Sequence, residues 1–212
     1  MDKRILNSSA ITNHQSMNKW EGHVEEYLLS RQKLNQMSVE EKRETFGFNK
    51  VYEDEKWKPV VHKNGFIIKT YEVSQYGKVR NLKGKILLPT DGYGIKGKKT
   101  YPGYSLRIVT KEWEEYTKTK RVVRKSDGKV SFPFSVTAHQ CVMNSWKPFH
   151  ENLLPELEEY WEKFSKELKT LIRDAILIDH IDDNPWNAHV DNLRYTTWSG
   201  NEWQNKLTKN NT

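Results

Sequence analysis

Cysteine and long apolar runs are nearly absent from this chain of 212 residues. Cys141 is the single cysteine, which excludes an internal disulfide and a zinc site built from several thiolates. No apolar run approaches the roughly 20 residues of a membrane-spanning helix, and the opening MDKRILNSSA lacks the apolar core of a signal peptide. We therefore expect a cytoplasmic protein with no membrane partner and no structural zinc.

Negative charge is scarce in the middle of the chain, although the formal net charge of the whole chain is only +7. Residues 76–130 contain 15 Lys or Arg and 5 Asp or Glu, whereas the rest of the chain contains 20 and 23. A concentrated positive surplus attracts phosphate backbones, because binding releases condensed counterions. The same surplus fits an ordinary solvated surface equally well, so charge alone does not decide the partner.

Local patterns predict an α+β fold, and they begin with a helical arm over residues 1–50. A helical pattern starts at about Ser16. A second, short helix opens at Ser38 with the pattern of a capping box, in which Glu41 is the second partner, and Gly47 is placed to end it. Packing and an arm laid along a partner explain these helices equally well.

Residues 51–135 change character, because short β-prone stretches alternate there with Gly, Pro and Asn. This pattern predicts a small antiparallel sheet with basic hairpins, and a loop at 92–104. After it, residues 136–212 begin with a helix at 137–147 that Thr137 caps. An amphipathic helix at 155–173 is predicted to follow and to support the segment after it.

The most informative segment is ILIDHIDDNPWNAHVDNLRYTTWSGNEWQNKLTKNN, residues 176–211. A short apolar strand at 176–178 leads into a polar pair, turn-forming residues follow, and 192–197 indicates a second strand. Ser199 is placed to cap a final helix. The polar residues that stand out are, in order, Asp179, His180, Asn192 and Asn201.

These residue types suit the hydrolysis of a phosphodiester bond. Asp179 offers charge and Asn201 a neutral oxygen to a hard divalent cation, which would neutralise the phosphate and assist the leaving oxygen. The imidazole of His180 titrates near neutrality and can take a proton from water. Asn192 could bond the second imidazole nitrogen or the backbone. Arg194 could bind the scissile phosphate or merely line its strand.

The same segment resembles the HNH, or ββα-metal, motif of phage intron-encoded homing endonucleases. The matching residues are Asp179-His180-Ile-Asp182-Asp183-Asn184-Pro-Trp-Asn187, then Asn192-Leu193-Arg194-Tyr195, then Asn201, with Asn205 as a further helix match. The resemblance implies that His180 is the general base, that Asp179 and Asn201 bind one Mg²⁺ ion for which Mn²⁺ can substitute, and that Asn192 supports the histidine. The family commonly has Gly where Asp183 stands.

The resemblance extends upstream to the β-rich DNA-binding module that often accompanies these nucleases. Residues 71–80 resemble that module, and 137–142, which includes His139, resembles a helix that the family has before its nuclease motif. Here residues 147–175 intervene, and we interpret them as an insertion. Double-stranded DNA is the implied partner, and the family favours a monomer over a dimer.

Basic residues of the middle region are the candidate DNA contacts. Lys78, Arg80, Lys83 and Lys85 are predicted to bind phosphates, which supplies affinity without sequence choice. Arg107 and Tyr104, on a predicted strand, could reach base edges.

Three alternatives to a homing nuclease stay open at this point. A DNA-binding protein with a degenerate HNH fold would bind without cutting, and a structural metal-binding or RNA-binding module would use the Asp and His only for stability. A restriction or packaging nuclease would share all of the chemistry.

Overall fold

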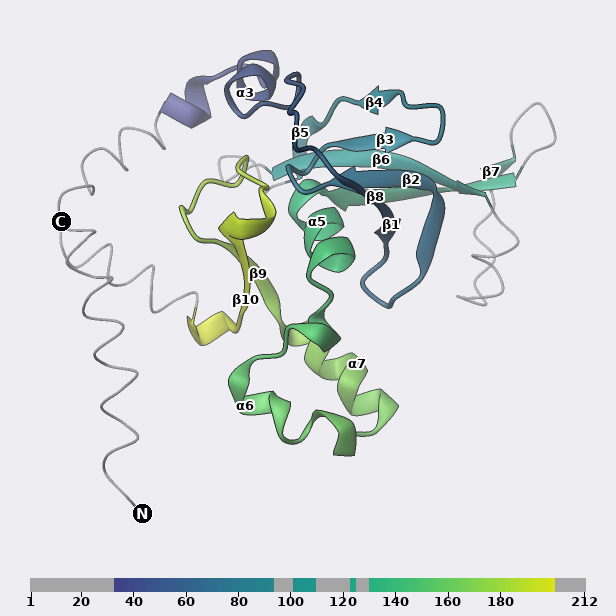
Figure 1. The fold of residues 1–212 in the computed structure, drawn as a ribbon, viewed down its shortest axis with the longest axis vertical. Helices are drawn as coiled ribbons and strands as arrows, with labels where there is room; N and C mark the ends of the chain where they lie inside the picture. Colours follow the sequence, from purple (N-terminus) through teal and green to yellow (C-terminus); the bar gives the residue numbers. More distant parts are fainter. Residues whose placement is uncertain (1–32, 94–100, 110–122, 125–129, 201–212) are drawn as a thin grey trace. The chain divides into compact units, whose positions relative to one another are not determined.

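Figure 1 shows the protein as a computed structural model, which describes residues 33–93, 101–109, 123–124 and 130–200. The chain divides into two units, Ser38–Asn201 and a second that joins Met1–Met37 to Glu202–Thr212. Residues 33–37 are the described part of that second unit, so the helix predicted from Ser16 falls almost wholly outside the described residues. All the labelled elements belong to Ser38–Asn201.

Helix α3 (Val39–Thr45) begins at a capping box. The Ser38 hydroxyl accepts a hydrogen bond from the backbone N–H of Glu41 at 3.2 Å, and the Glu41 carboxylate accepts one from the N–H of Ser38 at 2.6 Å. Gly47 follows the helix with a φ of 74°, a left-handed conformation that glycine adopts without strain. The predicted start and end of this helix are therefore confirmed.

The first four-stranded antiparallel sheet has the order β1-β2-β3-β4. Its strands are β1 (Trp57–Val61), β2 (Ile67–Ser74), β3 (Val79–Asn81) and β4 (Ile86–Leu87). The apolar residues Val60, Ile68, Val73 and Val79 are fully buried. A register shift between Pro59 and Val60 lies where proline can contribute no ladder N–H.

The second four-stranded sheet has the order β5-β6-β8-β7 and is also antiparallel. Its strands are β5 (Thr90–Tyr93), β6 (Tyr101–Val109), β7 (Val123–Arg124) and β8 (Val130–Thr137). The loop predicted at 92–104 is wrong at both ends, because β5 and β6 pair there through Tyr93 and Tyr101. Residues 94–100, between these strands, lie outside the described residues.

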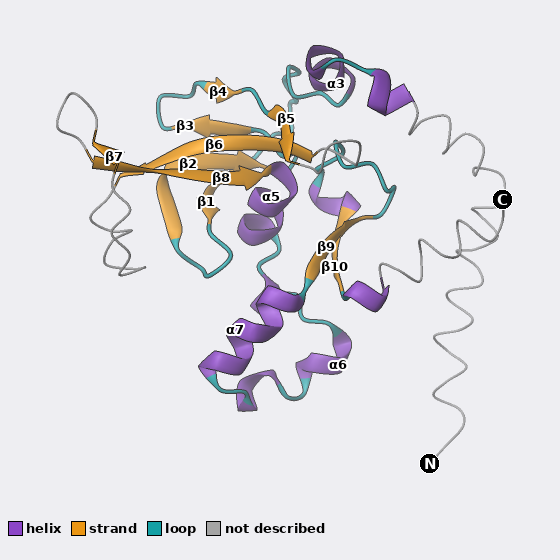
Figure 2. Cartoon of the chain, turned by 180° about the vertical axis from the view of Figure 1, so that it is seen from behind, coloured by secondary structure: helices purple, strands orange, loops and turns teal. Residues whose placement is uncertain are grey.

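Helix α5 (Ala138–Trp146) packs against strands of both sheets and against the C-terminal strands (Figure 2). Thr137 is its N-cap, and the Gln140 side chain accepts a hydrogen bond from the Thr137 N–H at 3.2 Å. The helix presents a continuous buried surface, which consists of Ala138, His139, Cys141, Val142, Met143 and Ser145. The helix predicted at 137–147 is thus confirmed, and it forms the centre of Ser38–Asn201.

The single helix predicted at 155–173 is wrong. The segment instead contains η1 (Phe149–Glu151), α6 (Pro155–Glu158), η2 (Trp161–Lys163) and α7 (Lys166–Ala175). Ser165 starts α7 by accepting a hydrogen bond from the N–H of Leu168, while Phe164 before it is extended. The turn buries Trp161 against Phe149, at 5.4 Å between ring centroids, which a continuous helix would not do.

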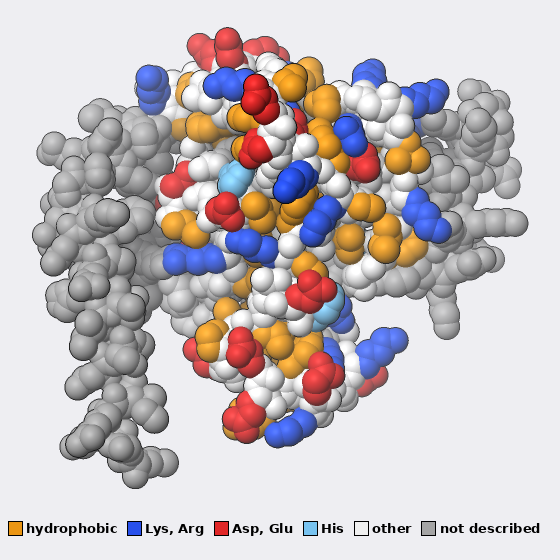
Figure 3. Space-filling model, viewed as in Figure 1, with side chains coloured by type: hydrophobic (Ala, Val, Ile, Leu, Met, Phe, Trp, Pro, Cys, Tyr) orange, Lys and Arg blue, Asp and Glu red, His pale blue; other side chains and the backbone are white. Residues whose placement is uncertain are grey.

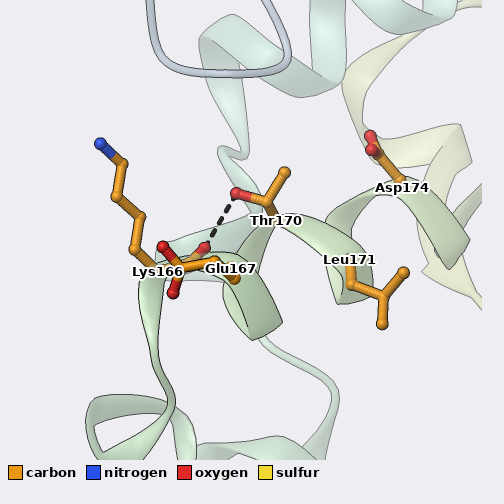
Figure 4. Close-up of a pocket in the computed structure, with 5 residues that line it drawn as sticks. All are labelled: Lys166, Glu167, Thr170, Leu171 and Asp174. Atoms are coloured by element: carbon orange, nitrogen blue, oxygen red, sulfur yellow. Dashed lines mark hydrogen bonds between the residues drawn. The ribbon is translucent and has the colours of Figure 1, made fainter.

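The apolar side of α7 is largely uncovered, because Leu171 is 66% exposed. An open hollow on this helix is lined by Lys166, Glu167, Thr170, Leu171 and Asp174 (Figure 4). It contains none of the predicted site residues. No helix in the described part of the chain is long and apolar enough to cross a membrane.

The C-terminal motif forms an antiparallel hairpin of β9 (Leu177–His180) and β10 (Leu193–Thr196), with η3 (Val190–Asn192) just before β10. Residues 198–200 are helical. Thr197, rather than the predicted Ser199, caps this turn, since its hydroxyl accepts a hydrogen bond from the Gly200 N–H. The protein is therefore a mixed α and β fold with antiparallel sheets. Residues 201–212, over which the final helix is predicted to continue, lie outside the described residues.

Candidate active site

Asp179 and Arg194 face each other across the β9–β10 hairpin. They are direct partners in the strand register. Nε and Nη2 of Arg194 donate hydrogen bonds to Oδ2 of Asp179 at 2.9 and 2.8 Å. Only 11% of the Asp179 side chain is exposed, against 41% of Arg194. Arg194 is predicted either to bind the scissile phosphate or to line its strand. In the structure its guanidinium binds the Asp179 carboxylate, and this pair fixes the direction of the Asp179 side chain.

His180 is buried, with 6% of its surface exposed, and its Nε2 atom is out of contact with solvent. Its ring lies 5.1 Å from that of His139 and 5.8 Å from that of Tyr101, measured between centroids. Our expectation of an imidazole that meets water is not fulfilled in this conformation. The sequence carried no sign of the burial, because Tyr101 and His139 belong to distant segments.

Asn192 closes the loop between the two strands. Its Oδ1 accepts a hydrogen bond from the Asp182 N–H at 3.1 Å, and its Nδ2 donates to the Asp182 carboxylate and to the Asn187 carbonyl, both at 2.8 Å. Of its two predicted partners, Asn192 therefore bonds the backbone, and its described side-chain hydrogen bonds all stay within the loop. Asp182 and Asn187 thus help to hold the loop in shape.

Asp183, in the same loop, has a φ of 55° and is the one non-glycine residue with a positive φ in the described ranges. This left-handed backbone costs most residues about 1–2 kcal/mol, although Asp and Asn tolerate it better than others. Burial also raises the pKa of its carboxyl from 3.8 to about 7. The loop thus holds a carboxyl in surroundings that disfavour its charged form.

We expect Asp183→Asn to stabilise the protein at pH 8 and to have little effect near pH 4. Between pH 4 and 7 the folded carboxyl keeps a proton that the unfolded chain releases, so stability falls as pH rises through this window. The gain at pH 8 should be on the order of 1–2 kcal/mol, which allows for the solvent that reaches this half-buried group. Urea unfolding at both pH values measures it, and an equal gain at the two values would contradict this account.

The loop between β9 and β10 is in contact with the turn between β2 and β3. The Val190 N–H donates a hydrogen bond to the Gln75 carbonyl at 2.8 Å, and the rings of Tyr76 and His189 lie 4.9 Å apart. Gly77 has a φ of 82°, and a Cβ placed on it would lie 2.7 Å from the Cβ of Ala188. The motif and the first sheet are therefore in direct contact.

Trp186 anchors the other side of the loop. It is 1% exposed and its ring centroid lies 5.7 Å from that of Phe48 and 6.4 Å from that of Phe46. Trp186 is therefore a core residue, and the residues after α3 pack against it. Trp198, in contrast, is 68% exposed, and Trp203 lies outside the described residues.

Two of the predicted DNA contacts are engaged elsewhere. Lys78 is 3% exposed, with its Nζ 2.6 Å from the Glu55 carboxylate, so the prediction that it binds phosphate is wrong for this conformation. Arg80 pairs with Glu72 at 2.7 Å, and its guanidinium lies 4.2 Å from the Trp57 ring centroid. The alternation of residue types along a strand can be seen in the sequence. It does not show that Lys78 pairs with a buried glutamate from another segment.

The remaining predicted contacts lie on the surface. Lys83 and Lys85 are exposed near the turn between β3 and β4, and Arg107 is exposed on β6. Tyr104, in contrast, is buried and donates its hydroxyl hydrogen to the Gly77 carbonyl, so it cannot reach a base. Figure 3 shows Lys and Arg side chains interspersed with apolar and acidic ones on one face. Nine of the 15 basic residues of 76–130 lie outside the described residues.

Of the two predicted metal ligands, the one within the described residues is the Asp179 carboxylate, a donor that suits a hard divalent cation. The two hydrogen bonds that Arg194 donates to Asp179 both fall on Oδ2, so they leave Oδ1 unused. The described ranges contain no group of three or more His, Cys, Asp or Glu that could hold an ion. Asn201, the second predicted ligand, lies directly after the described residues 198–200. The carboxylate suits such a cation, and a site would need at least Asn201 to join it.

Comparison with known proteins finds a likeness among solved structures. No family model and no curated protein matches the chain. Among solved structures, the chain is similar to the HNH homing endonuclease I-HmuI, in a structure that concerns its binding and cleavage of DNA. The identity is 20%, the TM-score is 0.35, and the match covers 74% of this chain and 60% of that one. This chain therefore spans less than two thirds of I-HmuI in the match, and a likeness of this strength does not establish a common fold.

Proposed function

We propose that this protein is a metal-dependent endonuclease that hydrolyses phosphodiester bonds of double-stranded DNA. The observation that supports this most directly is the hairpin geometry of Asp179, which precedes His180 at the end of β9 and is directed by Arg194 across the strand pair. Asn192 holds the loop between β9 and β10 in place through a hydrogen bond from the Asp182 N–H. These are the residues on which the resemblance to HNH homing endonucleases depends.

In the proposed reaction, Asp179 and Asn201 would hold a Mg²⁺ ion, which would supply positive charge to the phosphate and to the departing 3′ oxygen. His180 accepts a proton from the attacking water. Because Nε2 of His180 is enclosed in the described conformation, this role requires DNA binding to bring the ring into contact with water. In-line attack by the water oxygen forms the new bond to phosphorus and breaks the P–O3′ bond, and the departing 3′ oxygen takes a proton from solvent water. The ends are then a 5′-phosphate and a 3′-hydroxyl, and a monomer with one such site nicks one strand.

The burial of His180 favours a second candidate function. A ring with 6% exposure that stays enclosed would take no proton from water, and the protein would then bind DNA without cutting it. In that case Asp179 and Arg194 would stabilise the hairpin only. The exposed Lys83, Lys85 and Arg107 serve DNA binding under both candidates.

Incubation with supercoiled plasmid and Mg²⁺, in parallel with an excess of EDTA, separates these functions. The endonuclease should convert plasmid to open circles with Mg²⁺ or Mn²⁺ and should do nothing with EDTA, because the charge neutralisation comes from the metal. A gel-shift assay on the same DNA reports binding independently. Binding without cleavage under both metals would establish the second candidate, and sequencing of the ends would give the cut position.

A further inference from the structure

Three aromatic rings from distant parts of the sequence meet beside the candidate site. Tyr101 begins β6, His139 lies in the first turn of α5, and His180 ends β9. The Tyr101 and His139 centroids are 4.8 Å apart, and His139 meets His180 edge to face at 5.1 Å and 81°. We call these three residues the ring cluster.

Within the ring cluster, His139 is held firmly. It is 9% exposed, and its Nε2 lies 3.1 Å from the Thr137 hydroxyl in a hydrogen bond that ties the ring to the helix N-cap. Its Nδ1 is buried, and no described residue hydrogen bonds to it. Burial, followed by the proximity of His180, lowers its pKa to about 3. The ring is therefore neutral at physiological pH and unsuited to proton transfer there.

The orientation of His180, in contrast, is not fixed by its own backbone. Strand β9 directs the side chain, but the last torsion of a histidine is broad, with no sharply preferred value. A ring packed edge to face against it restricts that torsion, because such aromatic pairs have a preferred geometry. The ring plane decides where the nitrogens of His180 point, and a reaction is sensitive to misplacement of that size.

We propose that His139 is a positioning residue that fixes the ring plane of His180 through the edge-to-face contact. This inference rests on the function proposed above, in which His180 is the base. His139 itself touches neither water nor phosphate in this account. Its hydrogen bond to Thr137 and its burial in α5 make it the fixed partner of the pair.

Two variants of His139 separate the effect of its aromatic ring from the effect of its side-chain volume. His139→Phe keeps an aromatic edge for His180, whereas His139→Leu keeps apolar volume and loses the ring. The first readout is the NMR spectrum of ¹³C-histidine-labelled protein without metal or DNA, with His180→Ala used to assign the His180 signals. We expect one sharp set of His180 ring signals in the wild type and in His139→Phe, and broadened or doubled signals in His139→Leu.

The second readout is single-turnover cleavage of DNA together with DNA affinity. His139→Leu should cut about 10- to 100-fold more slowly, with unchanged affinity, while His139→Phe retains most of the rate. Val73→Ala, in the buried core of β2, is a control for loss of stability alone and should change neither readout.

Specific outcomes overturn the inference. Equal spectra and equal rates for His139→Phe and His139→Leu would show that the ring has no positioning role, as would equal slowing by Val73→Ala at the same melting temperature. If the wild type does not cut DNA at all, the endonuclease proposal fails, and the NMR comparison still decides whether His139 orders His180.

Discussion

Replacing His180 by alanine is expected to lower the rate of DNA cleavage by about 10²- to 10⁴-fold, the usual contribution of a general base. Affinity for DNA should be unchanged, because the exposed basic residues Lys83, Lys85 and Arg107 lie on other elements. Single-turnover nicking and a gel-shift assay measure the two effects. Cleavage at the wild-type rate would remove His180 from the reaction.

Two further variants protect this test from trivial explanations. His180 is buried, so alanine leaves a cavity that could destabilise the hairpin. His180→Asn fills more of that space and should lower the cleavage rate as much as His180→Ala does. His150→Ala removes a histidine that is 61% exposed at the side chain, and it should keep full activity. A thermal melt of each variant shows whether the fold survives.

Replacing Gly77 by alanine is expected to destabilise the protein by about 2–5 kcal/mol. Part of this cost is the left-handed backbone at φ 82°, about 1–2 kcal/mol for a residue with a Cβ. The rest is steric, since the new Cβ would lie 2.7 Å from the Cβ of Ala188, and overpacking typically costs 1–3 kcal/mol. Urea unfolding measures the total, which is a large fraction of the stability of an ordinary domain.

Gly84→Ala is the matched control for Gly77→Ala. Gly84 has nearly the same φ, 77°, and a Cβ on it would meet nothing within 4 Å. It should therefore show the backbone cost alone. The double variant Gly77→Ala with Ala188→Gly should recover part of the steric cost, because it removes the opposing methyl group. Equal losses for Gly77→Ala and Gly84→Ala would refute the contact with Ala188.

Elements set by local chemistry could be predicted from the sequence. The Ser38–Glu41 capping box and Gly47 define α3, because both signals act within a few residues. Thr137 starts α5 for the same reason. The Asp and Asn residues of the loop after β9 satisfy each other's hydrogen bonds, so their role also follows from their spacing.

Features that depend on distant partners could not be predicted. The burial of His180 needs Tyr101 and His139, which the sequence separates from it by tens of residues. Lys78 is basic and lies in a basic region, but its ion pair with Glu55 is a tertiary contact. The apolar stripe at 155–173 is compatible with one helix when it is considered alone. The contact of Trp161 with Phe149, which interrupts that helix, cannot be inferred from the stripe.

The hydrogen bond from Val190 to Gln75 and the close approach of Gly77 to Ala188 attach the loop of the β9–β10 hairpin directly to the first sheet. If the first sheet binds the duplex, the protein and not the DNA sets the distance between the bound bases and the phosphodiester bond that is cleaved, because the sheet and the loop are attached to each other. Cleavage would then fall at one constant offset instead of scattering over neighbouring nucleotides.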